Sequence, residues 1–66
     1  MQYTIRIVFT DKLAITKKIV AQSLAQATDM FFNECFLFED LLVDKMELKQ
    51  GRTRLAFQKF ENGKML

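Results

Sequence analysis

The sequence predicts an α+β fold: one antiparallel β-sheet, in the order β-β-α-β-β, packed on or curled around one amphipathic α-helix. Three observations lead to this prediction. Alternating apolar and polar residues fill both ends of the chain, helical spacing is confined to the middle, and turn residues separate the alternating segments. With 66 residues, the chain forms a single domain, residues 1–66. Because so short a chain buries only about 60% of its unfolded surface, close packing, self-association or a partner must complete its core.

Residues 3–9 predict the first strand, because residue types alternate with period two and β-branched residues are frequent. Its inward face carries Tyr3, Ile5, Ile7 and Phe9. Asp11 and Lys12 then supply a hairpin turn. Residues 13–21 predict the second strand, whose inward face carries Leu13, Ile15, Ile19 and Ala21. Lys17 interrupts that face, which indicates either a β-bulge near Lys17 and Lys18 or the edge of the core.

A capping box at Ser23 and Gln26 predicts the start of the helix. The Ser23 hydroxyl should accept the backbone N–H of Gln26, and the Gln26 side chain should accept the N–H of Ser23. Spacings of three and four then define the core stripe, which consists of Leu24, Ala27, Phe31, Cys35 and Phe38. The helix should run from residue 24 to a point between 34 and 38, with Asn33 as an earlier alternative end.

Two further strands follow the helix. Residues 42–50 place Met46 and Leu48 inward, with Lys45, Glu47 and Lys49 outward. Gly51 and Arg52 form a turn, and residues 53–60 predict a fourth strand with Leu55 and Phe57 inward, and Arg54 and Gln58 outward. Asn62-Gly63 favours a type I′ turn, in which both residues have positive φ. Residues 64–66 leave room only for a short fifth strand.

The segment from residue 30 to residue 43 is unusually apolar, since ten of its fourteen residues are apolar or cysteine. If the helix ends near Asn33, residues 35–38 form a buried crossover to the third strand. If it continues, Phe32 and Phe36 turn away from the core stripe and, with Leu41, form an apolar surface for a partner or a second copy. A third interpretation is an aggregation-prone chain that depends on a partner or chaperone.

The composition argues against an enzyme and against a metal or cofactor site. There is no histidine, which excludes an imidazole base and the common catalytic triads and dyads. Cys35 falls in the core stripe, where a thiol is normally an inert small apolar group. The acidic residues Glu39, Asp40 and Asp44 lack the spacing of a calcium loop and fit a solvated loop. We therefore expect no catalytic residues, no metal and no cofactor.

Charge is segregated along the chain although the net charge is only +2. Residues 19–44 contain five acids and no base, so the remaining residues carry all ten bases and three acids. We expect Arg6, Lys18 and Arg54 to lie on the sheet face away from the helix, with Phe60, in phase with Arg54, as its candidate stacking aromatic. Such a face either binds phosphates and acidic partners or is simply solvated.

Two segments carry a resemblance to a known family. The residues I-V-A-Q-S-L-A-Q-A, from Ile19 to Ala27, and L-A-F-Q-K-F-E-N-G-K, from Leu55 to Lys64, resemble parts of small phage-encoded anti-CRISPR proteins. The resemblance is to an inhibitor of type I-F surveillance complexes. It implies a short sheet curled around one helix, and binding to the backbone subunits of an RNA-guided complex so that target DNA cannot pair with the guide. The family's helix carries basic residues, which residues 19–44 lack, so no individual residue role is carried over.

The sequence therefore leads us to expect a non-enzymatic, phage-type anti-defence inhibitor that occupies a nucleic-acid-binding or acidic surface of a host protein complex. The residues expected to bind the partner are Arg6, Lys17, Lys18, Arg52, Arg54, Phe32 and Phe36. The alternatives are a small, dimeric nucleic-acid-binding regulator and a structural subunit of an obligate complex. No apolar run is long enough to span a membrane and no signal peptide is apparent, so we expect a location in the host cytoplasm.

Overall fold

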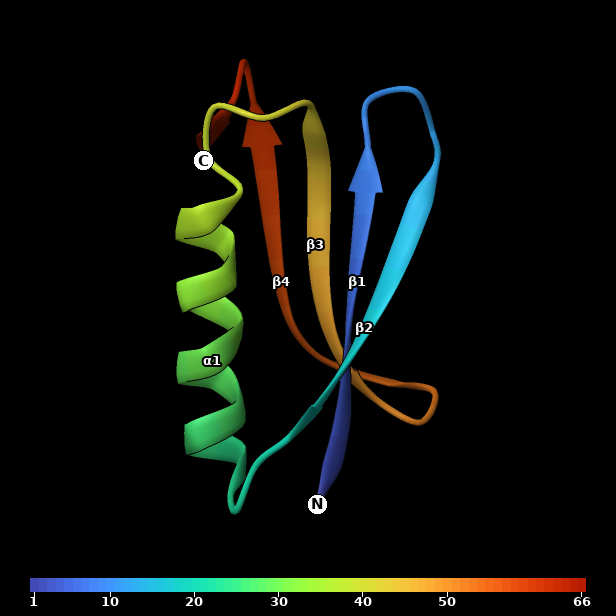
Figure 1. Cartoon of the computed structure of the whole chain (residues 1–66), viewed down its shortest axis with the longest axis vertical. Coiled ribbons are helices and arrows are strands. Elements are labelled where there is room, and N and C mark those ends of the chain that lie inside the picture. Colours follow the sequence, from blue (N-terminus) through green and yellow to red (C-terminus); the bar gives the residue numbers. More distant parts are fainter.

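One five-stranded antiparallel sheet and one helix make up the fold, as the sequence predicts (Figure 1). The computed structural model describes every residue from Met1 to Leu66. The elements are β1 (Gln2–Phe9), β2 (Ala14–Val20), α1 (Leu24–Leu37), β3 (Val43–Gln50), β4 (Thr53–Glu61) and β5 (Lys64–Met65). Their order across the sheet is β2-β1-β3-β4-β5, so α1 carries the chain past β1 from one of its neighbours to the other.

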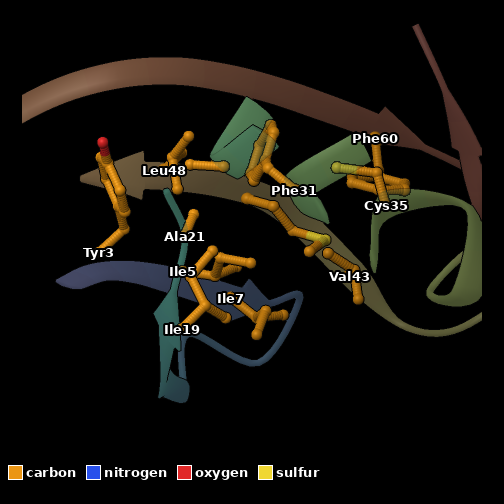
Figure 2. Packing of buried hydrophobic residues seen from close by; sticks show 12 residues of the cluster. Tyr3, Ile5, Ile7, Ile19, Ala21, Phe31, Cys35, Val43, Leu48 and Phe60 are labelled. Atoms are coloured by element: carbon orange, nitrogen blue, oxygen red, sulfur yellow. The ribbon is translucent and has the colours of Figure 1, made fainter. Parts of the chain in front are cut away.

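The core lies between α1 and one face of the sheet. Figure 2 shows Phe31 and Cys35 from the helix meeting side chains of the strands, among them Ile5, Ile7 and Leu48. Twelve buried residues form this cluster, and all of them are apolar, a tyrosine or the cysteine. Tyr3 lies at one end of the cluster in Figure 2, with its hydroxyl pointing away from it. The alternation of β1 and the helix positions Ala27, Phe31 and Cys35 are confirmed as core. Leu24, Leu13 and Ile15 were also expected inward, but they are 49%, 68% and 50% exposed because they lie at the start of the helix and in or next to the outermost strand, beyond the edge of the core.

The helix begins where the capping box places it. The backbone N–H of Gln26 donates to the Ser23 hydroxyl at 3.1 Å, and Ser23 has the extended backbone of an N-cap. The reciprocal bond differs from the prediction by one residue, because the side-chain oxygen of Gln26 accepts the N–H of Gln22, not that of Ser23. Both bonds nevertheless fix the entry into α1.

The helix ends at Leu37, so Asn33 is not a stop and the interpretation of residues 35–38 as a buried crossover is wrong. Phe38 is the C-cap, and its N–H donates to the carbonyls of Glu34 and Cys35. Asp40 then takes a φ of 67°, which turns the chain towards β3. Because the helix continues, Phe36 projects to solvent with 62% of its surface exposed, and Phe32 is 37% exposed.

Lys17 marks the edge of the core and not a β-bulge. The β1–β2 ladder is regular from Gln2 opposite Val20 to Val8 opposite Ala14, and it pairs Ile5 with Lys17. Lys17 therefore lies on the helix side of the outermost strand, where its ammonium group reaches the carboxylate of Glu34 in α1. The regular ladder excludes a β-bulge here, so Lys17 interrupts the apolar pattern because it lies at the edge of the core.

A β-bulge in β4 overturns part of the prediction for that strand. Leu48 pairs with Ala56 and Lys49 pairs with Arg54, so Leu55 is an extra residue without a partner. From that point the alternation is reversed. Leu55 packs against the core as expected, but Phe57 is 42% exposed and lies on the opposite side. Gln58 pairs with core residue Met46, and Phe60 is buried in the core, so neither lies on the face assigned to it from the sequence.

The last strand, β5, lies at the end of the sheet where the helix ends. Figure 1 shows the C-terminus beside the last turn of α1. Asn62 and Gly63 both have positive φ, at 54° and 82°, as the predicted turn requires. The backbone N–H of Asp40 donates to the Gly63 carbonyl at 2.6 Å, which joins the loop after the helix to this turn. The helix is too short and too polar to cross a membrane.

Candidate functional site

The sheet has one face that the helix does not cover, here called the open face. The strand register aligns its side chains in three rows across β2, β1, β3 and β4. The first row holds Lys18, Thr4, Lys49 and Arg54, the second holds Thr16, Arg6, Glu47 and Phe57, and the third holds Ala14, Val8, Lys45 and Lys59. Val8 is the one buried residue that does not belong to the core cluster, because it lies on the open face and the cluster lies on the helix side.

The open face concentrates the positive charge of the molecule. Its twelve residues include six bases and one acid, a net charge of 6 − 1 = +5. The whole chain has a net charge of +2, so all remaining residues together carry 2 − 5 = −3. Although the net charge of the protein is small, its charge is unevenly distributed: the open face is cationic and the remaining residues together are anionic.

Two cross-strand pairs on the open face bring like charges together. Lys49 lies directly opposite Arg54, and Lys45 lies directly opposite Lys59. Directly opposed residues of an antiparallel pair approach closely, and like charges there destabilise a sheet. Neither pair therefore stabilises the isolated fold. An anion bound between the two side chains of a pair would reduce their electrostatic repulsion.

Glu47 is the one acid of the open face, and it organises two of the bases. One of its carboxylate oxygens lies 3.4 Å from Arg6, and the other lies 3.7 Å from Arg54. The Glu47 side chain is only 12% exposed, whereas the two arginine side chains are about half exposed. The carboxylate therefore lies beneath the guanidinium groups and orients them without removing them from solvent.

Phe57 is the one aromatic side chain among the twelve residues, and it pairs with Glu47 across the strands. The guanidinium carbon of Arg54 lies 4.8 Å from the centroid of its ring, a cation–π distance. Glu47 and Phe57 together thus hold Arg54 in place. The result is an exposed ring with a planar cation over it, in the row between two rows of basic side chains.

The structure brings together three of the seven residues that the sequence selected as partner-binding. Arg6, Lys18 and Arg54 all lie on the open face, as expected. Lys17 lies on the other side of β2, in contact with Glu34, and Arg52 lies in the exposed turn between β3 and β4. Phe32 and Phe36 are exposed on the helix, away from this face. The expected set is therefore divided among four places, of which the open face holds three residues.

Four basic or aromatic residues of the open face were not selected from the sequence, namely Lys45, Lys49, Phe57 and Lys59. The alternation of β3 already places Lys45 and Lys49 outward, so a count of all outward bases would have found these two. Phe57 and Lys59 depend on the bulge at Leu55. The available signal was the spacing of Leu55 and Phe60. In a regular strand, two residues five positions apart point to opposite faces, so a shared core face for both requires a bulge in the strand.

A second candidate region is an open hollow of about 450 Å³ at the end of the sheet near the C-terminus. Among its lining residues are Asp40, Asp44 and Glu61, and Asp40 binds the ammonium group of Lys64 at 2.8 Å. That hydrogen bond raises the pKa of Lys64. No three acidic, cysteine or histidine side chains in the chain converge on a point where they could hold a metal ion. Among the three acids that line the hollow, Asp40 is the one held in an ion pair.

Cys35 offers no nucleophile at neutral pH. Its side chain is fully buried in the core, and burial, assisted by the Glu34 carboxylate, raises the pKa of the thiol to about 11. The open face is thus the part of this structure where exposed positive charge is most concentrated.

No family model, curated protein or solved structure matches this chain.

Proposed function

We propose that this is a non-enzymatic binding protein whose open face binds the phosphate backbone of a nucleic acid. The observation that carries the proposal is the net charge of +5 on twelve aligned residues of one sheet face. Phosphates are the commonest closely spaced anions that an array of this kind can neutralise. Arginine and lysine side chains and threonine hydroxyl groups, all present here, are the usual ligands of phosphate oxygens.

The two pairs of directly opposed positive charges favour a partner with several negative charges at regular intervals. One phosphate between Lys49 and Arg54, or between Lys45 and Lys59, would turn a repulsion into two attractive contacts. The two pairs lie in the first and third rows, so a chain of phosphates could reach both. A partner with a single isolated anion would leave most of the face unpaired.

Binding assays with purified protein test this proposal. We expect labelled DNA and RNA to bind, with an affinity that falls steeply as salt is raised, since each neutralised phosphate adds roughly 0.7–0.9 to the logarithmic salt slope. Lys49→Glu should weaken binding and reduce the slope. Lys12→Glu, in the turn between β1 and β2, is the matched control because it changes the net charge equally but lies off the open face. Equal losses in both variants would show that net charge alone matters and would overturn the proposal.

The second candidate is the anti-defence inhibitor that the resemblance implies. In that case the open face docks on an acidic or nucleic-acid-binding surface of a host complex, such as an RNA-guided surveillance complex, in the cytoplasm. The exposure of Phe36 and Phe32 favours this candidate, because apolar helix residues can add contact area for a protein partner or for a second copy.

A pull-down from host lysate, with and without nuclease treatment, separates the candidates. An inhibitor directed at a protein should retain its partner complex after nuclease treatment and should bind free nucleic acid weakly. A direct nucleic-acid binder should lose its captured material after the same treatment. Sedimentation of the pure protein at high concentration tests a homodimer, and a monomer throughout would exclude self-association through the helix. A structural subunit of an obligate complex would instead be captured with one constant partner.

A further inference from the structure

We infer that the nucleic acid bound by the open face is single-stranded, and that one of its bases stacks on Phe57 and the Arg54 guanidinium above it. This inference rests on the phosphate binding proposed above and adds the class of ligand. Phosphate contacts alone do not distinguish a duplex from a single strand. The exposed aromatic group in the middle of the cationic face makes that distinction.

Phe57 is not needed for the core, and within the fold its ring contacts the Arg54 guanidinium. It lies on the side of the sheet away from the core cluster, and 42% of its surface is exposed among charged and hydroxyl-bearing neighbours. A leucine or threonine would satisfy the strand equally well there. An aromatic ring offers in addition a flat π surface, on which any base can stack.

The position of the ring fits a strand with accessible bases. Phe57 is in the second row, and the basic rows on either side are each about 7 Å away along the strands, from the rise of two residues. A base over the ring would therefore have cationic side chains within reach of the phosphates before and after it. Lys49 and Lys59 are examples from the first and third rows.

Arg54 extends the same platform. Its guanidinium carbon lies 4.8 Å from the ring centroid, and Glu47 holds the group at 3.7 Å. A guanidinium plane is itself a stacking surface for an unpaired base, and its charge assists a neighbouring phosphate. The guanidinium lies over the ring, so a base can stack on the outer side of the guanidinium with the ring beneath it, or on the part of the ring that stays exposed.

A duplex fits the same surface poorly. Its bases are stacked inside the helix, so they cannot reach Phe57, and it is normally read by a helix or a two-stranded ribbon inserted into a groove. The one helix of this protein lies on the other side of the sheet. Residues 19–44, which include this helix, contain no lysine or arginine. A duplex could touch the basic rows but would leave the ring unused.

Fluorescence anisotropy with a short single strand of DNA, the same strand as RNA, the matching duplex and polyphosphate tests the inference. Phe57→Leu and Phe57→Ala should each weaken binding of the single strands by about 5- to 150-fold, the range expected for one stacked base. Binding of duplex and polyphosphate should not change. Phe57→Trp should keep or increase single-strand affinity, because it keeps a stacking ring. Leu37→Ala, which removes an exposed apolar side chain from the helix, is the control and should have no effect.

A 2-aminopurine base in the single strand gives an independent reading. Its fluorescence should be quenched on binding to the wild type and not on binding to Phe57→Leu. If the leucine variant binds single strands as tightly as wild type, or if the duplex binds more tightly than the single strand, base stacking is excluded while phosphate binding stands. If none of the four ligands binds the wild type, the proposed function itself fails.

Discussion

Lys49 of β3 and Arg54 of β4 lie directly opposite each other on the open face, so two positive side chains occupy one cross-strand pair. A sheet selected for stability alone would place opposite charges there. The bulge at Leu55 makes the pair, because without it Lys49 would face a different residue of β4. The arrangement lowers the stability of the sheet and supports the proposal that this face binds an anionic ligand.

Replacing one member of this pair should therefore separate stability from binding. Lys49→Glu should raise the free energy of unfolding by about 0.2–1 kcal/mol, because a repulsive pair becomes attractive. The same variant should bind nucleic acid more weakly. Urea unfolding followed by circular dichroism measures the first effect, and anisotropy the second. A variant that is less stable than wild type, or that binds as well, would contradict the prediction.

Phe31 and Phe36 are both phenylalanines of α1, but the fold depends on only one of them. Phe31 is fully buried, so Phe31→Ala should lower the free energy of unfolding by about 3–5 kcal/mol. A core of this size supplies roughly that much stability, so the variant should be largely unfolded. Phe36→Ala, at a position that is 62% exposed, should change stability by no more than about 0.5 kcal/mol. Thermal melts of the two variants test this contrast, and similar melts would refute it.

Gly63 should tolerate a side chain less well than Gly51. Both have positive φ, at 82° and 60°, so alanine at either position is strained by about 1–2 kcal/mol. A Cβ at Gly63 would in addition lie 3.0 Å from the Cα of Asp40, whereas a Cβ at Gly51 would meet no atom within 4 Å. Gly63→Ala should therefore be the more destabilising substitution in chemical denaturation. Equal losses would mean that the loop at Asp40 moves aside freely.

The buried thiol of Cys35 should make stability depend on pH in the alkaline range. Its pKa is raised from 9.0 to about 11 in the folded protein, so the folded state favours the neutral thiol. This contribution is complete below pH 9 and is lost as the pH rises from 9 to 11, by up to about 3 kcal/mol. Cys35→Ala should lose less stability than wild type over the same range. Denaturant midpoints of both proteins at pH 8, 9.5 and 11 measure the difference, and parallel curves would argue against it.

Local patterns were sufficient for most of the fold. The strand alternation in β1 and β3, the helix start at Ser23 and the Asn62-Gly63 turn each reflect interactions within a few residues, and each of these predictions is confirmed. The end of the helix was less certain, because both a stop near Asn33 and a longer helix agree with the same apolar run. The Phe38 cap and the positive φ of Asp40, which depend on the packing of the following loop, decide it.

By itself, then, the sequence determined the class of fold, the single helix, the inward face of β1 and the presence of outward bases on β1, β2 and β3. Only the tertiary structure decided which bases share a surface, because that depends on strand register and on the bulge at Leu55. One extra residue in β4 reverses every side chain after it, so Phe57 and Lys59 reach the open face and Phe60 enters the core. A pattern of period two cannot indicate where such an insertion falls, since the partner strand that accommodates it is distant in the sequence.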